Sequence, residues 1–488
     1  MTQDFAALYD AFASRDSRFD GVFFVGVSST GIYCRPVCTA RMPKAANCRF
    51  FPSAAAAEQA AFRPCLRCRP ELAPGNAPVD GSQRLARRIA DRIGEGMLDG
   101  GAGVEEIAAE FHVSSRQLRR IIQKEFGVSP MELVTTRRLL LAKQLLTETT
   151  LPVIEVAYAS GFASLRRFND AFRGRYGMPP TRLRREAAGT PARTHPPDTL
   201  TLQLAYRPPY DWTGMTEFLG TRALRGVERA TADGYARTVR VGDRTGWIHV
   251  RHAPGRHTLR VDLSHSLTPV LPAVLGRLRD VFDLGARPDL VAAKLAQDER
   301  LADAVARNPG LRVPGAFDGF EMAVRAVLGQ QVTVKGAATL ASRWVEAFGE
   351  PVETPHPELT RLAPTPQRMA EASVEELAAL GIIRARARSI LALAEEVASG
   401  RLKLEAGAQP EQAIRQLVAL PGIGPWTAHY VAMRALRWPD AFPKEDVVLQ
   451  RNLGGVTAAR AEALSRAWSP WRSYATLHLW RTPPEARV

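Results

Sequence analysis

The spacing of hydrophobic and polar positions changes several times along this chain. Between residues 82 and 185, apolar residues recur at the intervals of amphipathic helices. Residues 186–198 have no periodic apolar pattern and the composition of a linker. Short strand-like segments follow, accompanied by two helical stretches, and the strands are expected at residues 199–206, 234–241, 245–252 and 257–263. From about residue 289 to the end the pattern is mainly helical, so we expect a multidomain, mainly α fold with α+β parts.

The first helical region contains the same helix-turn-helix pattern twice. Residues 104–122 predict a helix-turn-helix with its turn at His112-Val113, and residues 153–172 predict a second one with its turn at Ser160-Gly161. A helix over residues 130–146 would link them. Each second helix begins with Ser or Ala-Ser and presents arginines on its polar side, as helices that enter a DNA groove do. The candidate DNA contacts are Arg116, Gln117, Arg120, Arg166, Arg167 and Asn169.

A helical hairpin is predicted near the C-terminus. The apolar run 413–420 breaks at Pro-Gly-Ile-Gly and resumes over residues 426–436. Gly422 and Gly424 allow positive φ and close backbone approach in such a turn. Amides at the start of the second helix form an anion site, and a DNA phosphate is the anion that we expect there.

Composition narrows the function classes. A length of 488 residues suggests three or four domains, and the hydrophobic content of 45% is enough for a core in each. The net charge of +15 and the isoelectric point near 10.1 indicate a polyanionic partner, although charge alone also fits ribosomal or membrane-surface binding. No apolar run approaches the roughly 20 residues of a membrane-spanning helix. The first residues lack the pattern of a signal peptide, so we expect a cytoplasmic protein.

All five cysteines lie between positions 34 and 68. Cys34 and Cys38 form one pair with metal-ligand spacing, Cys65 and Cys68 form another, and Cys48 stands alone as an expected bystander. In a reducing cytosol, one tetrahedral zinc site with four cysteine ligands fits better than disulfides. On spacing alone, the default interpretation is a structural zinc ribbon.

The residues around these cysteines add chemistry. Thr30-Gly-Ile-Tyr-Cys-Arg-Pro-Val-Cys38 and Phe62-Arg-Pro-Cys-Leu-Arg-Cys-Arg-Pro70, with Arg41, resemble the Ada-type methyl-phosphotriester acceptor domain over about residues 3–77. The resemblance implies that Cys34 irreversibly takes a methyl group from an alkylated DNA phosphate. Cys38, Cys65 and Cys68 would hold the zinc ion with Cys34, and zinc coordination keeps a thiolate available at neutral pH. The phosphate contacts would be Arg35, Arg67 and Arg69.

Two further resemblances cover the rest of the chain. The tandem helix-turn-helix, ending in Phe172-Arg-Gly-Arg-Tyr-Gly-Met-Pro-Pro180, is similar to the AraC-type regulator domain. From about Thr199 onward the chain resembles the 3-methyladenine DNA glycosylase II family of the helix–hairpin–helix superfamily. That resemblance is carried by Arg207-Pro-Pro-Tyr-Asp-Trp212, Arg325-Ala-Val-Leu-Gly-Gln-Gln-Val332, the hairpin, and Trp468-Ser-Pro-Trp-Arg-Ser-Tyr474.

The glycosylase resemblance implies a catalytic carboxylate at Asp446. An alignment anchored on Gln450-Arg451 would choose Glu445 instead. Asp446 is favoured because Leu449, three residues on, fits the helix start of the superfamily, where Asp also caps well.

The same resemblance implies an aromatic cleft for a flipped base. Trp426, Tyr430, Trp480 and Phe218 match positions that line it, and their electron-rich faces favour a cationic base. For each aromatic residue singly, an ordinary core position is the competing interpretation. Gln331 occupies the position of an intercalating Leu in one member of the family.

Two absences define the chemistry further. Relatives with lyase activity carry a Lys where this chain has Trp426, and iron–sulfur relatives carry four C-terminal cysteines, whereas no cysteine follows Cys68 here. The resemblance therefore implies a monofunctional glycosylase without an iron–sulfur cluster. A Pro-Cys-His-Arg active site is absent from the sequence, so we expect no second methyltransferase of the kind found in longer Ada proteins.

The predicted domains are 1–78 (zinc methyl acceptor), 80–187 (tandem helix-turn-helix), 188–198 (linker), 199–288 (small α/β domain) and 289–488 (helix–hairpin–helix glycosylase). Together they predict an alkylation sensor and transcriptional activator fused to a glycosylase that excises alkylated bases such as 3-methyladenine.

The expected partners are alkylated and promoter double-stranded DNA and RNA polymerase, with no membrane, and the expected state is a monomer. Two alternatives stay open. One is a transcription factor whose C-terminal half only binds damaged DNA, and the other is a zinc-ribbon DNA-binding enzyme without methyl transfer.

Overall fold

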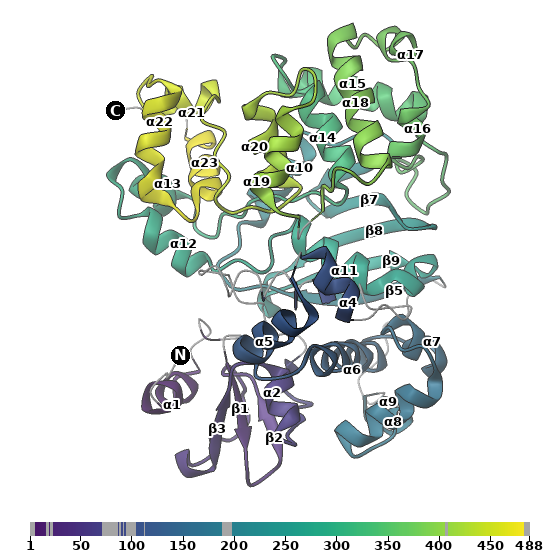
Figure 1. Ribbon diagram of the computed structural model, residues 1–488. Helices are drawn as coiled ribbons and strands as arrows, with labels where there is room; N and C mark the ends of the chain where they lie inside the picture. The colour runs from purple at the N-terminus through teal and green to yellow at the C-terminus, as the bar shows by residue number, and fades with distance from the viewer. Residues whose placement is uncertain are drawn as a thin grey trace. The chain divides into compact units, whose positions relative to one another are not determined.

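The computed structural model describes residues 5–15, 19, 23–70, 86, 89–90, 92–93, 104–111, 113–187, 198–405 and 408–482. Their contacts form two units. The first is Met1–Arg207 with Ala253–Gly276 and Leu284–Ala286, and the second is Pro208–His252 with Arg277–Asp283 and Arg287–Val488. Figure 1 labels the helices and strands. The predicted linker, apart from residue 198, and the turn residue His112 lie outside the described residues. Among the residues described, no helix combines the length and apolar character needed to cross a bilayer.

The first unit begins with a small sheet that carries the cysteines. Its strand order is β3-β1-β2-β4, and β2 pairs antiparallel with β1 and parallel with β4. Cys34 ends β2 and Cys65 follows β4 directly, so the pairing of these two strands brings the two halves of the cysteine motif together. The elements are α1 (Phe5–Ala13), β1 (Phe24–Val27), β2 (Ile32–Cys34), η2 (Ala45–Asn47), β3 (Cys48–Phe51), α2 (Ala54–Gln59) and β4 (Arg63–Pro64).

The tandem helix-turn-helix follows in the same unit, and its helices begin at side-chain caps. The hydroxyls of Ser114, Ser129 and Ser164 accept from backbone amides of the first helical turn, while Gly127 and Gly177 end α5 and α8 in the left-handed region. Both predicted motifs are confirmed, and the linking helix runs two residues further than expected. The helices are α4 (Val104–Glu110), α5 (Ser115–Phe126), α6 (Pro130–Glu148), α7 (Val153–Ala159), α8 (Leu165–Tyr176) and α9 (Pro180–Ala187).

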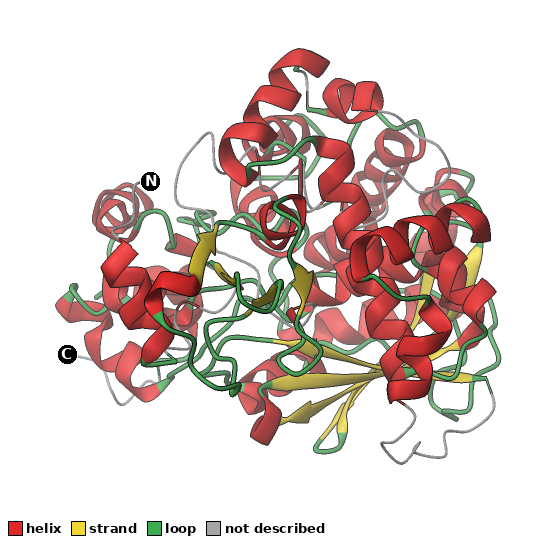
Figure 2. Ribbon diagram, turned by 90° about the horizontal axis from the view of Figure 1, so that it is seen from below, coloured by secondary structure: helices red, strands yellow, loops and turns green. Residues whose placement is uncertain are grey.

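A five-stranded sheet has the order β5-β9-β8-β7-β6, and Figure 2 shows its strands in yellow. The four expected strands are present, but β6 was not predicted, because Glu228-Arg-Ala-Thr lacks apolar alternation. The elements of this region are β5 (Thr199–Ala205), α10 (Trp212–Gly220), β6 (Glu228–Thr231), β7 (Gly234–Val241), β8 (Arg244–Ala253), η4 (Pro254–Arg256), β9 (Thr258–Ser264), η5 (His265–Val270) and α11 (Leu271–Val281).

The rest of the second unit is helical, as expected. Eight of the ten residues of α14 are buried, which makes this helix the centre of the domain, and α20, α18 and α15 pack against it. The helices are α12 (Pro288–Leu295), α13 (Glu299–Arg307), α14 (Gly319–Leu328), α15 (Val334–Phe348), α16 (Pro366–Ala370), α17 (Val374–Ala379), α18 (Arg384–Ala398), α19 (Pro410–Val418), α20 (Pro425–Arg434), α21 (Val447–Asn452), α22 (Ala458–Ser465), η6 (Arg466–Trp468) and α23 (Arg472–Trp480).

Candidate functional site

The predicted hairpin connects α19 to α20. Gly422 has a φ of +74°, and a side chain at this position would collide with the Ser389 hydroxyl, so the turn requires glycine on both counts. Gln330 braces the hairpin, because its Nε2 donates to the Gly422 carbonyl and to Thr427 Oγ1, both at 3.0 Å. Gly424 is the N-cap residue of α20. The binding of a phosphate at these amides stays a prediction.

Asp446 is the N-cap residue of α21 and accepts three hydrogen bonds. Its Oδ1 accepts from the Leu449 amide at 2.8 Å and from Trp480 Nε1 at 3.0 Å, and its Oδ2 accepts from Trp426 Nε1 at 2.9 Å. Three N–H donors fix the orientation of the carboxylate. The carboxylate of Glu445, the alternative in the sequence, makes none of these contacts, and its buried Oε2 accepts no hydrogen bond within the part of the chain described.

Asp446 lies in the wall of a cavity of about 560 Å³ within the second unit. The same cavity is lined by Trp426, Tyr430, Trp480 and Phe218. Trp426 and Tyr430 are stacked, with ring centroids 5.4 Å apart and an interplanar angle of 13°, and Tyr430 lies 6.0 Å from Trp480. The structure therefore brings together the predicted carboxylate and the four predicted aromatic residues in a space of the size that small ligands occupy.

Gln331 does not line this cavity, although its neighbours Gly329 and Val332 do. It is exposed between α14 and α15, and its φ of +53° places it in the left-handed region. Such a conformation is uncommon for a residue other than glycine and often marks a functional turn.

The base of the cavity is more cationic than the sequence indicated. The Arg222 guanidinium lies 3.8 Å from the centroid of the Phe218 ring, and that of Arg434 lies 4.8 Å from it. Arg434 also donates to the Tyr430 hydroxyl at 2.8 Å. Burial alone would raise the pKa of Tyr430, but the charges of Arg434 and Arg222 lower it below the ordinary value. Phe218 therefore presents part of its aromatic surface to the protein's own cations.

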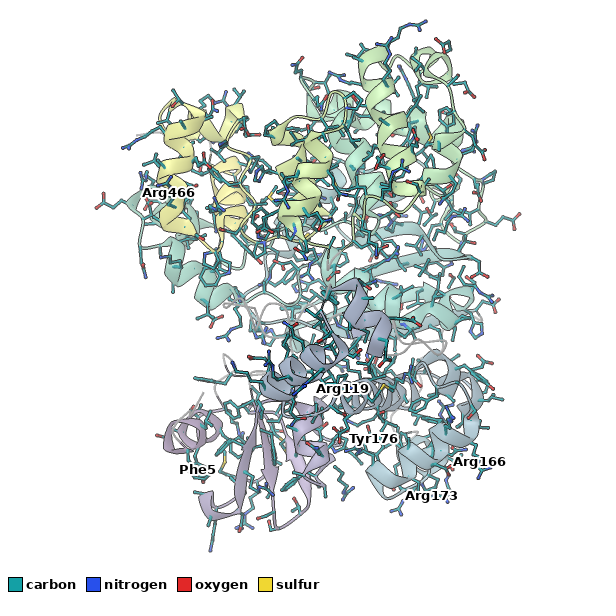
Figure 3. The ribbon with its side chains drawn as sticks, viewed as in Figure 1. Phe5, Arg119, Arg166, Arg173, Tyr176 and Arg466 are labelled. Atoms are coloured by element: carbon teal, nitrogen blue, oxygen red, sulfur yellow. The ribbon has the colours of Figure 1, made fainter. Side chains whose placement is uncertain are left out.

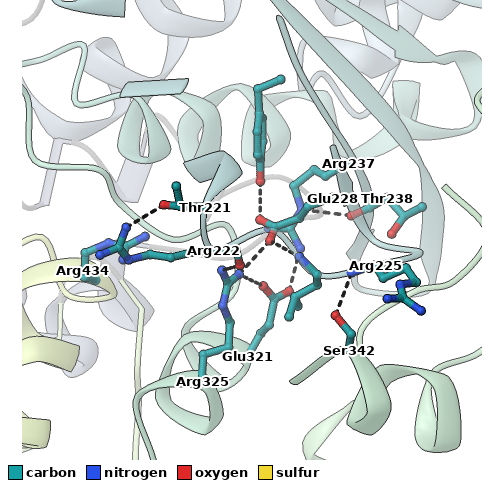
Figure 4. Close-up of polar contacts among 12 residues, drawn as sticks. Thr221, Arg222, Arg225, Glu228, Arg237, Thr238, Glu321, Arg325, Ser342 and Arg434 are labelled. Carbon is teal, nitrogen blue, oxygen red and sulfur yellow. Dashed lines mark hydrogen bonds and ion pairs between the residues drawn. The ribbon is translucent and has the colours of Figure 1, made fainter. Parts of the chain in front are cut away.

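A buried network of two carboxylates and two guanidinium groups supports this region (Figure 4). Arg325 Nη1 donates to Glu228 Oε2 at 2.9 Å and to Glu321 Oε1 at 3.0 Å, while Arg237 Nη2 donates to Glu321 Oε2 at 2.6 Å. Arg325 Nη2 also donates to the Arg222 carbonyl at 2.5 Å. Although burial opposes it, the two arginines lower the pKa of Glu228. The network is neutral overall and ties β6 and β7 to α14, which positions Arg222 in the cavity.

The four predicted zinc ligands form one cluster in the first unit. One ligand atom from each of Cys34, Cys38, Cys65 and Cys68 lies within 4.8 Å of all the others. A tetrahedral zinc ion with Zn–S bonds of about 2.3 Å needs sulfur atoms roughly 3.8 Å apart, so this donor set fits zinc. Cys48 lies in a separate apolar cluster with Phe23 and Val25, and its thiol contacts the Lys44 carbonyl.

Backbone amides also point at the cluster. The Arg35 amide donates to Cys68 Sγ at 3.3 Å, and the Cys68 amide donates to Cys65 Sγ at 3.5 Å. Such bonds stabilise thiolate charge and orient ligands. Cys34 is 7% exposed.

The three arginines predicted to contact phosphate differ in their surroundings. The Arg67 side chain is exposed, and Arg35 Nη1 donates to the Cys68 carbonyl at 3.2 Å. Arg69 donates instead to Glu148 at 2.7 Å and to Thr147 at 3.1 Å. The guanidinium of Arg69 therefore has partners within the protein, and its contact with a phosphate stays a prediction.

The candidate DNA contacts of the two helix-turn-helix motifs lie on α5 and α8. Arg116, Gln117 and Arg120 are exposed on α5, and Arg166 and Arg167 are exposed on α8, while Asn169 is half-buried. Figure 3 labels Arg166 and Arg173 on α8. The Arg166 side chain is 92% exposed, so it is available to a partner.

The chain matches four protein families in succession. Residues 7–71 match the metal-binding domain of Ada, residues 107–186 a helix-turn-helix domain, residues 201–318 the AlkA N-terminal domain, and residues 324–470 the HhH-GPD superfamily of base excision DNA repair proteins.

Individual relatives match the whole chain or a part of it. The chain is 39% identical, over the whole of both chains, to the "probable bifunctional transcriptional activator/DNA repair enzyme AlkA" of Mycobacterium tuberculosis. It is 40% identical to "DNA-3-methyladenine glycosylase 2" of Escherichia coli over 57% of this chain and 96% of that protein. The solved 3-methyladenine DNA glycosylase of Archaeoglobus fulgidus shares the fold, with a TM-score of 0.50 and 22% identity over 57% of this chain and 96% of that one.

Four family matches in this order, and 39% identity to one relative over the full length of both chains, agree with the cysteine cluster, the tandem helix-turn-helix and the aromatic cavity. The chain belongs to the family of bifunctional transcriptional activator/DNA repair enzymes of the AlkA type.

Proposed function

We propose that this protein senses DNA alkylation, activates transcription in response, and removes alkylated bases such as 3-methyladenine. The observation that carries the proposal is the Asp446 carboxylate, held by two indole N–H groups in an aromatic cavity. The cysteine cluster adds an acceptor for methyl groups on DNA phosphates, and the tandem helix-turn-helix adds a reader of promoter DNA.

Base excision requires an extrahelical nucleotide, because the glycosidic bond is inaccessible in a stacked duplex. An alkylated purine is already a cationic leaving group, so the main task is to stabilise the positive charge that develops on the sugar. Asp446 is suited to this role and to orienting the attacking water, since its orientation is fixed before the substrate binds. Trp426 cannot form a Schiff base, so the product is an abasic site in an intact strand. At the hairpin, Gly422 and Gly424 would present backbone amides to a DNA phosphate.

Methyl transfer is a direct displacement. The Cys34 thiolate attacks the methyl carbon of a methyl phosphotriester, and a carbon–sulfur bond forms as the carbon–oxygen bond breaks. The electron pair of that bond goes to the phosphate oxygen and restores the anionic diester. The zinc ion that the cluster would bind keeps the thiolate deprotonated at neutral pH. Because a thioether is stable, each molecule acts once.

The regulatory half works through DNA contacts. The residues assigned to it are Arg116, Gln117, Arg120, Arg166, Arg167 and Asn169 for the promoter, and Arg35 and Arg67 for phosphates near Cys34. The protein acts as a monomer in the cytoplasm, where it recruits RNA polymerase to promoters of alkylation-response genes.

One experiment tests both activities in the full-length zinc protein. Duplex DNA treated with a methylating agent is incubated with the protein. Released bases are then measured by chromatography, and protein peptides by mass spectrometry. We expect catalytic release of alkylated bases and one added methyl group on the peptide containing Cys34. Binding to methylated DNA without base release would leave a transcription factor that only recognises damage. Methylation of Cys68 alone would contradict the assignment of Cys34.

A further inference from the structure

The C-terminal end of α6 carries a buried carboxylate that belongs to neither site described above. Glu148 Oε1 accepts from Arg69 Nη2 at 2.7 Å, and its Oε2 accepts from Gln144 Nε2 at 2.9 Å and from the Gln203 amide at 3.1 Å. The Glu148 side chain is only 7% exposed. These partners come from three parts of the first unit: the cysteine region, α6 itself, and strand β5.

The contact with β5 involves the backbone of an edge strand. β5 is the first strand in the sheet order, so one side of it has no neighbouring strand among the residues that the structure describes. On that side the Gln203 amide donates to Glu148, and the Gln203 carbonyl accepts from Gln144 Nε2 at 2.9 Å. Gln144 and Glu148 are four residues apart on one face of α6. Together they bind both backbone polar groups of Gln203, its N–H and its C=O. Uncovered edge groups invite unwanted strand pairing, and here a helix covers them.

A second contact lies next to the first. His265 begins η5 immediately after β9, and its Nε2 lies 3.3 Å from Glu155 Oε2 on α7. β9 is the strand that pairs with β5, with Thr199 opposite Ser264. The end of α6 thus contacts β5, and the start of α7 contacts the residue that directly follows β9.

The cysteine region is attached to the same helix. Lys143 is 1% exposed, and its ammonium group donates to the carbonyl of Cys65, a zinc ligand, at 3.3 Å. Arg69 follows the ligand Cys68 directly and has a φ of +53°. The turn that carries two zinc ligands therefore positions Arg69 against Glu148.

We infer that α6 is an intramolecular docking element, which binds the edge strand of the small α/β domain through Gln144 and Glu148 and is held in place by the zinc-binding turn through Arg69 and Lys143. The docking contact stands without any assumption about function, whereas its dependence on zinc rests on the proposed zinc site.

Hydrogen–deuterium exchange of the full-length zinc protein measures this docking at β5. In Glu148→Gln the charge is lost, and the amide nitrogen of the new side chain faces either Arg69 or the Gln203 amide, donor against donor. Loss of one buried, charge-assisted bond corresponds to about 10- to 100-fold faster exchange in the peptide that contains β5. Gln203→Pro removes the backbone N–H donor together with the glutamine side chain, at an outward edge position where proline is tolerated. Glu186→Gln is the matched control, because Glu186 forms an exposed pair with Arg182 at 2.9 Å in the same domain.

We expect β5 to exchange faster in Glu148→Gln and in Gln203→Pro. The double variant should exchange no faster than the faster of the two single variants. Exchange in Glu186→Gln should equal that of the wild type. Exchange in α14 should be the same in all variants, which excludes global unfolding. Zinc chelation should also accelerate exchange in β5. Unchanged exchange in both single variants would overturn the docking, and an effect of the variants without an effect of chelation would overturn its dependence on zinc. Base release and methyl transfer, measured on the same samples, test the proposed function separately.

Discussion

Replacement of Asp446 by Asn is the most direct test of the glycosylase site. Asn is as good an N-cap residue as Asp, so α21 and the fold should persist. The Asn carbonyl oxygen can accept from the Leu449 amide and from Trp480, which both bind Oδ1 now. The Asn amide nitrogen then faces Trp426 Nε1, donor against donor, where Oδ2 accepts at 2.9 Å in the wild type. The variant removes one charge and one hydrogen bond and leaves the cavity otherwise intact.

The expected loss of rate follows from the lost charge. A positive charge that develops on the sugar about 4 Å from the carboxylate interacts with it by about 4 kcal/mol at an effective dielectric constant of about 20. Because each 1.36 kcal/mol of barrier is about tenfold in rate, single-turnover base release should fall by about 10³-fold. Affinity for damaged DNA should change little, because this interaction grows strong only as the glycosidic bond breaks.

The assay is single-turnover release of 3-methyladenine from duplex DNA, with DNA binding measured in parallel. Glu445→Gln is the matched control, since it removes the neighbouring carboxylate, which makes none of the indole contacts. We expect near-normal rates in Glu445→Gln. Normal turnover in Asp446→Asn together with an inactive Glu445→Gln would show that the catalytic carboxylate is misassigned by one residue. If Asp446→Asn lowers the melting temperature markedly as well as the rate, the carboxylate has a structural role instead.

Three further predictions concern other parts of the chain. Borohydride should trap no covalent enzyme–DNA adduct, because Trp426 offers no amine; a trapped adduct that is lost on replacing a lysine would contradict this. Methylation of Cys34 removes one negative charge from a zinc cluster with four thiolates, worth about 1 kcal/mol for each phosphate about 7 Å away at a dielectric constant of about 40. With two or three such phosphates, operator affinity should therefore rise on the order of 10- to 100-fold at low salt, and the gain should shrink as salt increases. A gain that high salt does not diminish would refute the electrostatic origin. Burial lowers the pKa of His478 to about 4. Above pH 6.5 this histidine is neutral in both states, and between pH 6.5 and 4 only the unfolded state gains the proton, so about 3 kcal/mol of stability should be lost across that window. His478→Gln should flatten this part of the melting-temperature profile relative to the exposed control His257→Gln.

Local signals in the sequence accounted for much of the fold. Both helix-turn-helix motifs were predictable because a serine cap starts each second helix and a glycine ends it, and these are contacts between near neighbours in the chain. The cysteine cluster was predictable from ligand spacing alone. Strand β6 was missed because its stability comes from pairing with β7 and from burial of Glu228 against arginines, neither of which leaves an apolar pattern.

The partners of the site residues were less predictable, since they come from distant parts of the chain. The residues around Asp446 were expected to be aromatic, but nothing in the sequence indicated that two indole N–H groups donate to its carboxylate. Gln330, which braces the hairpin, lies within a motif used only for the resemblance, and its partners Gly422 and Thr427 lie 92 and 97 positions later in the chain. The ion pair between Arg69 and Glu148 was not predicted, because the two residues are 79 positions apart in the chain.

The charges around the cavity have a direction that matches the proposed reaction. Asp446 bonds to Trp426, Trp426 stacks on Tyr430, and Tyr430 accepts from Arg434, so the line of contacts runs from an anionic end to a cationic end. An alkylated purine nucleoside begins with its positive charge on the base, and bond cleavage moves that charge to the sugar. With the sugar at the Asp446 end, as the proposed role of this carboxylate requires, the charge moves away from Arg434 and toward Asp446. The arginines then raise the energy of the charged ground state while the carboxylate lowers that of the transition state, and both effects reduce the barrier. The same arrangement gives Arg222 and Arg434 a role that aromatic stacking alone does not provide.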